Sequence, residues 1–92
     1  MTVKVKIPTQ LRQLTAGLSE LEIDEATDIR GLIQKVKQDH PAVIERIVDE
    51  HGEIRRFVNV FAGDEDVRFL EGLDTKLEGI NVVSILPAVA GG

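Results

Sequence analysis

Cysteine is absent from this 92-residue sequence, and so are tryptophan and tyrosine. Without a thiol, the chain has no disulfide, no thiolate metal site and no cysteine nucleophile. Long apolar runs are missing as well, since none approaches the roughly 20 residues that a membrane-spanning helix needs. The N-terminal segment carries no apolar stretch typical of a signal peptide, so we expect a cytoplasmic protein without a membrane partner.

Positive charge is scarce, with 11 Lys and Arg residues against 16 Asp and Glu residues and a net charge of -5. The pair Arg55-Arg56 is too small a basic cluster to indicate a nucleic-acid partner. The spacing of His40 and His51 matches no standard metal site. No glycine-rich phosphate loop and no nucleophile–base pair stands out, so the sequence predicts no enzyme activity, no metal and no bound cofactor.

The residues that are present indicate one folded domain. Hydrophobic residues make up 42% of the chain, which is too many for a disordered protein. Residues 3–7 alternate β-branched and lysine side chains, which predicts a half-buried strand that Pro8 ends. Residues 20–23 alternate glutamate with apolar residues and predict a second strand, close enough to pair with the first as an antiparallel hairpin.

Two helices are expected next. Apolar residues recur at helical spacing over 29–36, with Thr27 as the predicted N-cap and Gly31 as a mild cost to helix stability. Pro41 stops this helix and suits the first turn of a second one. We expect the second helix to run to Gly52.

The remaining segments predict three more strands. Residues 57–61 form an apolar run broken only by Asn59, which predicts a buried central strand. A polar turn at 63–66 leads into a short strand at 67–69. Residues 73–77 predict a turn or one helical turn, and residues 82–86 the final strand. The fold class is therefore α+β, with a mixed sheet and a main and a short helix on one face.

The expected domain covers residues 1–86, and a flexible tail covers 87–92. The tail loses side-chain bulk towards Gly91-Gly92, so it can enter a narrow channel of another protein. Its reactive group would be the α-carboxylate of Gly92, which needs activation, most simply as an acyl-adenylate made from ATP. A sulfur nucleophile would then give a thiocarboxylate. The competing interpretation is a frayed or engineered chain end.

Three segments resemble a known family. Residues 85–92 look like the C-terminus of the ThiS/MoaD sulfur carriers. Residues 57–69 and the opening 5–12 are similar to the carriers of cysteine biosynthesis, the CysO type. The resemblance implies a ubiquitin-like β-grasp fold whose first and last strands are central, parallel neighbours.

The resemblance also implies a chemistry and a set of partners. An E1-like enzyme would use ATP and a sulfur donor to adenylate Gly92 and convert it to a thiocarboxylate, with Val89, Ala90 and Gly91 as the tail motif. A pyridoxal-phosphate-dependent cysteine synthase would receive the sulfur, and a zinc metalloprotease would release the cysteine. The chain itself would bind no cofactor.

Other functions stay open at this point. Within the family, the chain could be the small subunit of molybdopterin synthase or, less favoured, a thiamine-type carrier. Outside sulfur transfer, it could be a ubiquitin-like modifier that joins Gly92 to a lysine. It could also be a non-covalent β-grasp interaction module with an incidental tail.

A partner-docking surface is a further hypothesis. Phe57 and Phe61 share a strand face with Asn59, opposite two valines, and would point away from the helices. Phe69 and Leu86 are the other candidates for this surface. The alternative is that one or more of these side chains fills the core.

Overall fold

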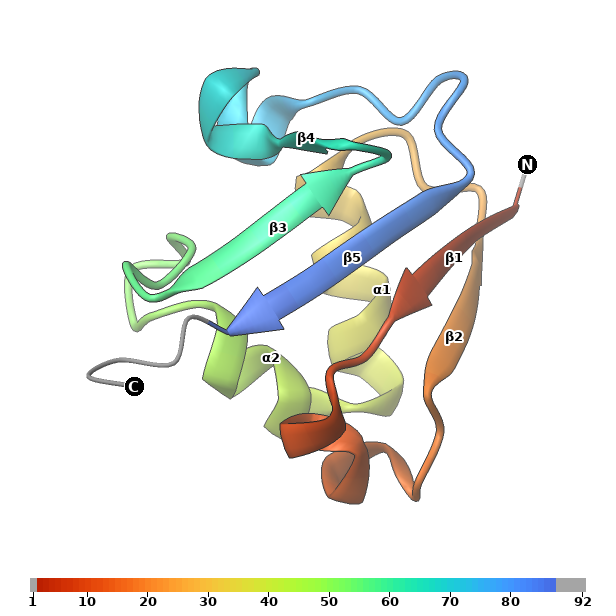
Figure 1. Cartoon of the computed structure of the whole chain (residues 1–92), viewed down its shortest axis with the longest axis vertical. Coiled ribbons are helices and arrows are strands. Elements are labelled where there is room, and N and C mark those ends of the chain that lie inside the picture. Colours follow the sequence, from red (N-terminus) through yellow and green to blue (C-terminus); the bar gives the residue numbers. More distant parts are fainter. Residues whose placement is uncertain (1, 88–92) are drawn as a thin grey trace.

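The computed structural model describes residues 2–87 and shows a five-stranded mixed sheet with two α-helices packed on one face (Figure 1). The strand order is β2-β1-β5-β3-β4. The α-helices and strands are β1 (Thr2–Lys6), β2 (Glu20–Asp24), α1 (Ile29–Asp39), α2 (Pro41–Ile47), β3 (Val58–Ala62), β4 (Glu65–Asp66) and β5 (Val82–Pro87). The described residues also contain three 3-10 helices: η1 (Thr9–Thr15), η2 (Val67–Phe69) and η3 (Gly72–Asp74).

The predicted hairpin of the first two strands is confirmed. β1 and β2 pair antiparallel from Thr2–Asp24 to Lys6–Glu20. Both strands alternate exposed and buried residues, as the period of two requires. β1 also pairs with β5 in parallel, so the first and last strands are neighbours inside the sheet.

β3 departs in part from the prediction of a buried central strand. It lies between β5 and the two-residue β4, but only one of its faces is buried. Val58, Val60 and Ala62 face the helices, while Asn59 and Phe61 are half-buried on the other face. An antiparallel strand with one covered face needs only alternate apolar residues, and the two phenylalanines made the run look continuous.

The core lies between the sheet and the helices. It is a single cluster that takes β-branched and leucine side chains from every layer of the fold, and its most deeply buried members include Val5, Ile29, Val43, Val67, Leu77 and Val83. Among residues 2–87 no helix is long and apolar enough to cross a membrane.

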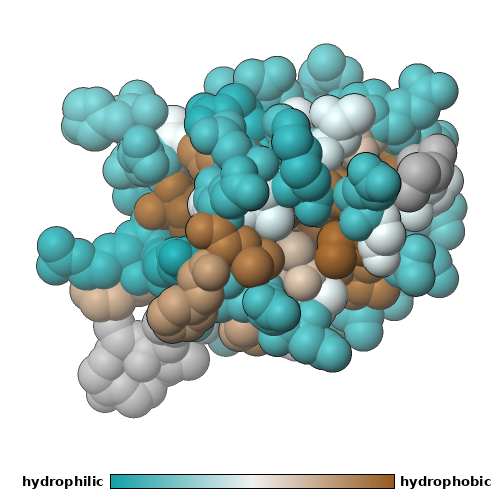
Figure 2. Space-filling view, turned by 90° about the horizontal axis from the view of Figure 1, so that it is seen from above, coloured by the Kyte–Doolittle hydropathy of each residue, from teal (hydrophilic) through white to brown (hydrophobic). Residues whose placement is uncertain are grey.

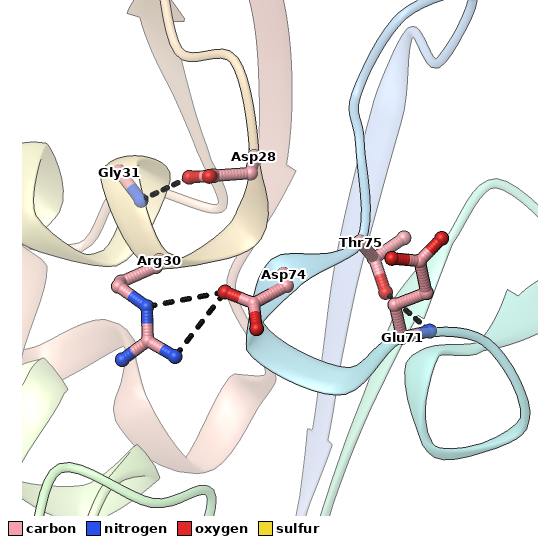
Figure 3. Close-up of polar contacts among 6 residues, drawn as sticks. All are labelled: Asp28, Arg30, Gly31, Glu71, Asp74 and Thr75. Carbon is pink, nitrogen blue, oxygen red and sulfur yellow. Dashed lines mark hydrogen bonds and ion pairs between the residues drawn. The ribbon is translucent and has the colours of Figure 1, made fainter.

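α1 begins one residue later than predicted. Asp28, not Thr27, is the N-cap, and its Oδ1 accepts a hydrogen bond of 2.8 Å from the Gly31 amide (Figure 3). The Thr27 carbonyl instead accepts from the Leu77 amide at 3.0 Å. A Cβ at Gly31 would lie 3.2 Å from Asp28 Oδ1, so this glycine leaves room for the cap.

α2 begins at Pro41 as predicted but ends at Ile47, well before Gly52. Val48 is extended and forms a bridge with Ile54, which turns the chain back after the helix. Gly52 lies in that turn with φ of 79°.

The strand predicted at 67–69 is wrong, because these residues form η2. Asp66 Oδ1 accepts a 2.8 Å hydrogen bond from the Arg68 amide, and this side-chain cap bends the chain out of the sheet. The predicted helical turn near residue 73 is present as η3.

Candidate functional site

The C-terminal end of β5 is the part of the described structure that lies next to the tail in the sequence. Pro87 is the last residue of β5 and pairs with Val58 of β3, so the strand includes the first residue of the predicted tail. The tail motif of Val89, Ala90 and Gly91 and the predicted reactive Gly92 lie outside the described residues. The described part of the site is therefore the platform from which these residues extend.

The open face of the sheet provides that platform (Figure 1). Leu86 is 48% exposed and lies directly opposite Asn59, and Ser84 lies opposite Phe61. Phe57 precedes β3 and is 56% exposed. The structure thus places Phe57, Phe61 and Leu86 on or beside the face that the helices do not cover, as the docking hypothesis requires. We call these three residues the open-face patch.

Phe69 belongs to a different surface. It lies in η2, is 86% exposed and is followed by the exposed Leu70. Figure 2 looks down on the end of the molecule where β4 and η2 lie in Figure 1, and shows apolar side chains surrounded by hydrophilic ones. The 3-10 helix carries Phe69 past the edge strand instead of along the sheet.

Arg68 is a contributor to the site that the sequence did not indicate. Its guanidinium donates to Asn59 Oδ1 at 2.9 Å and to the carbonyls of Arg55 and Arg56 at 2.7 and 3.1 Å. These bonds tie η2 to the beginning of β3, next to Leu86. Only the turn at Asp66 makes this contact possible, so strand periodicity gave no sign of it.

The turn before β3 carries a perturbed carboxylate. The amides of Glu53 and His51 donate to Asp49 Oδ1 at 3.1 and 2.8 Å. These hydrogen bonds, that from Glu53 first, hold the pKa of Asp49 below its usual range, with smaller help from the charges of His51 and Arg55.

The histidines stand apart from each other. His40 lies between α1 and α2. His51 is exposed, and its Nε2 lies 3.7 Å from Glu50 Oε1. Among residues 2–87, no three histidine or acidic side chains are grouped so that they could hold a metal ion.

The family model for ThiS matches residues 5–92. The chain belongs to the ThiS family. Sulfur carrier protein CysO of Mycobacterium tuberculosis is 40% identical over 94 residues, with all of both chains covered. A putative sulfur carrier protein of Archaeoglobus fulgidus is 36% identical over 93 residues, again with full coverage.

Comparison with solved structures supports the same family. The crystal structure of the Amycolatopsis orientalis BexX/CysO complex contains a chain with a TM-score of 0.87 and 39% identity, which covers 98% of this chain and 99% of that one. The expected membership in the ThiS family, its CysO type and the β-grasp fold are therefore confirmed.

Proposed function

We propose that this ThiS-family chain is a sulfur carrier for cysteine biosynthesis, and that the carboxylate of Gly92 holds the sulfur as a thiocarboxylate. The full-length similarity to CysO sulfur carriers is the observation that carries this proposal. The end of β5 supports it, because Pro87, the last residue of the strand, immediately precedes the small residues of the tail in the sequence.

The chain would act as a substrate and not as a catalyst. An E1-like enzyme would adenylate Gly92, releasing pyrophosphate from ATP, and a sulfur donor would displace AMP. The sulfur of the resulting thiocarboxylate would form a bond to the β-carbon of an activated serine on a pyridoxal-phosphate-dependent cysteine synthase, with loss of the serine's leaving group, so that the new cysteine stays attached to the carrier. A metalloprotease would then cut the cysteine from the carrier. The chain contributes its C-terminal carboxylate and a docking surface, and its partners contribute the catalytic groups.

The open-face patch would be the surface that these partners share. Its side chains are apolar and solvent-exposed or half-buried, and they lie beside the strand that leads to the tail. Burial of such side chains against a partner would bring the C-terminal residues into a defined position at the partner's active site.

Intact mass spectrometry tests the chemistry. The chain is incubated with ATP, a sulfide source and the E1-like adenylating enzyme of the source organism. We expect a mass gain of one sulfur-for-oxygen exchange, and none for a variant that lacks Gly91 and Gly92. Products joined to lysine would instead favour a modifier. No mass change with an enzyme that is active on another carrier would contradict both covalent functions.

The identity of the molecule that accepts the sulfur tests which biosynthetic pathway the chain serves. The thiocarboxylated chain is mixed with a cysteine synthase and O-phosphoserine in one reaction, and with the large subunit of molybdopterin synthase and the molybdopterin precursor in another. Transfer to the serine derivative alone is expected. Transfer in the second reaction alone would reassign the chain to molybdenum cofactor synthesis.

A further inference from the structure

Among the described residues, the edge of β5 next to β1 has no partner strand beyond the pair Lys6–Ser84. The parallel pairing of β1 with β5 ends at Lys6–Ser84, whereas β5 continues to Pro87 and pairs there only with β3. Beyond Lys6 the chain reaches Pro8, which has no amide proton, and turns into η1. A short length of strand edge is therefore open at the base of the tail.

The direction of the backbone carbonyls defines what this edge offers. The Lys4 amide donates to the Asn81 carbonyl at 2.9 Å, so that carbonyl points towards β1. Carbonyls two residues apart in a strand point to the same side, so those of Ile85 and Pro87 point along the open edge. A second strand could donate amide protons to both.

A cavity of about 390 Å³ lies at this edge. Its wall combines the end of β1, the start of η1 and the end of β5, and we call it the edge notch. Its lining includes Lys6, Ile7, Pro8, Arg12, Ile85 and Leu86. Leu86 thus belongs to both the notch and the open-face patch, so the two surfaces are continuous.

Two cations line the edge notch, Lys6 and Arg12. Arg12 is half-buried, and its Nε donates to the Ile7 carbonyl at 3.1 Å, which holds the guanidinium in place. Within the described part of the chain neither cation has a carboxylate within 4.0 Å. Arg30 differs, because it pairs with Asp74 at 3.3 Å (Figure 3).

Fixing a guanidinium through Nε leaves its two terminal amino groups for a second partner. These two groups form a fork that matches the two oxygens of a carboxylate. In a chain with a net charge of -5, a pre-positioned cation beside an open strand edge selects for an acidic occupant by charge complementarity.

We propose that the edge notch binds an extended acidic segment of the adenylating partner, which adds to β5 as a short strand and places a carboxylate on Arg12. Its amide protons would bond to the carbonyls of Ile85 and Pro87, and Lys6 would add attraction at the rim. The inference rests on the proposed function, since it names the recognition element of the enzyme that activates Gly92. This segment would hold the end of β5 in place while the open-face patch contacts the same enzyme.

Binding to the purified E1-like enzyme of the source organism tests the notch. We compare wild type with Arg12→Gln and with Arg46→Gln, a matched loss of charge at an exposed position of α2. Arg12→Gln is expected to raise Kd about tenfold and to reduce its salt dependence, as loss of one charge-assisted contact should. Arg46→Gln is expected to stay within about twofold.

Steady-state pyrophosphate exchange separates docking from chemistry. Arg12→Gln should raise KM for the carrier and leave kcat unchanged, because the notch contributes to binding and holds none of the reacting atoms. Thermal unfolding must show that the variant is folded. If it is not, Arg12→Lys replaces it, because this variant keeps the charge and loses the fork; it should bind more weakly than wild type.

Zero-length carbodiimide crosslinking identifies the occupant. In the Arg12→Lys variant, the new amine should couple to an Asp or Glu of the enzyme, and peptide mapping should locate that residue in an extended segment. Coupling to a second copy of the chain, or none in a complex that still forms, would overturn the proposal.

The carrier function and the occupancy of the edge notch can be disproved separately. If wild type is adenylated but Arg12→Gln behaves as Arg46→Gln does, the notch is wrong and the carrier function stands. If wild type neither binds the enzyme nor undergoes exchange, the carrier function fails and the notch proposal falls with it.

Discussion

Ile85 and Leu86 are neighbours in β5 with opposite environments. Ile85 is 6% exposed and faces the helices, whereas Leu86 is 48% exposed on the open face beside Asn59. A pleated strand gives successive side chains to opposite faces, so a single strand serves two purposes. One face anchors β5 in the core, and the other presents apolar surface close to the last described residue, Pro87.

Ile85→Ala gives the largest effect that this comparison predicts. Removal of a buried isoleucine loses apolar burial and leaves a cavity, so we expect the free energy of unfolding to fall by about 2–5 kcal/mol. Urea unfolding followed by circular dichroism measures the change. A loss below about 1 kcal/mol would mean that β5 is not held by its buried face.

Leu86→Ala is expected to affect binding instead. The side chain is half exposed, so its removal should lower stability by less than about 1 kcal/mol. It should weaken binding to the adenylating enzyme about tenfold, as loss of an interface anchor does. Leu70→Ala is the matched control, because Leu70 is 42% exposed but lies after η2.

Phe61→Arg is a stronger perturbation of the open-face patch, because it places a charge there. The fold should persist, since the arginine stem can lie over the open face, and binding should weaken at least as much as with Leu86→Ala. The docking hypothesis would be contradicted if Leu86→Ala and Leu70→Ala bound the adenylating enzyme equally well. Global unfolding of Phe61→Arg would contradict it too.

Asp28→Ala tests how the helix that covers the buried face is held. Loss of the side-chain cap to Gly31 should cost about 1 kcal/mol of the free energy of unfolding. Thr27→Ala is the neighbouring control and should cost less than about 0.5 kcal/mol, because Thr27 contributes its carbonyl and not its side chain. Equal losses for the two variants would contradict the assignment of the cap.

The smallest predicted effect concerns the turn before β3. The pKa of Asp49 is lowered in the folded state, first by the hydrogen bond from the Glu53 amide. Its contribution to stability is therefore present above the unfolded pKa of about 3.9 and is lost as pH falls through the lower folded pKa. Asp49→Asn should flatten the pH dependence of unfolding in that acidic range. An unchanged pH profile would show that the turn does not depend on the charge.

Much of the fold follows from local periodicity. The alternation in β1 and β2 and the helical spacing of α1 depend on which side of an element is buried, and that information is in the nearby sequence. The cap, the end of α2 and η2 were missed because each depends on a distant or side-chain contact. Thr27 is held by Leu77, Val48 pairs with Ile54, and Asp66 caps the turn that holds Arg68.

The candidate site, like the fold, could be predicted only in part from the sequence. The face on which Phe61 lies could be predicted, because a period of two fixes it once the valines are buried, whereas Phe57 precedes β3. Their degree of exposure depends on the absence of covering helices on that face, and the separate position of Phe69 depends on η2. The edge notch depends on where β1 leaves β5, which no pattern within either strand indicates.

Peptide-level mass spectrometry tests directly whether Gly92 carries the sulfur. After reaction of the chain with ATP, a sulfide source and the adenylating enzyme, the C-terminal peptide is isolated and fragmented. We expect the exchanged sulfur on the carboxyl group of Gly92, and we expect the peptide to react as a thiocarboxylate. Sulfur at any other residue, or an unmodified Gly92 in a reaction that consumes ATP, would contradict this expectation.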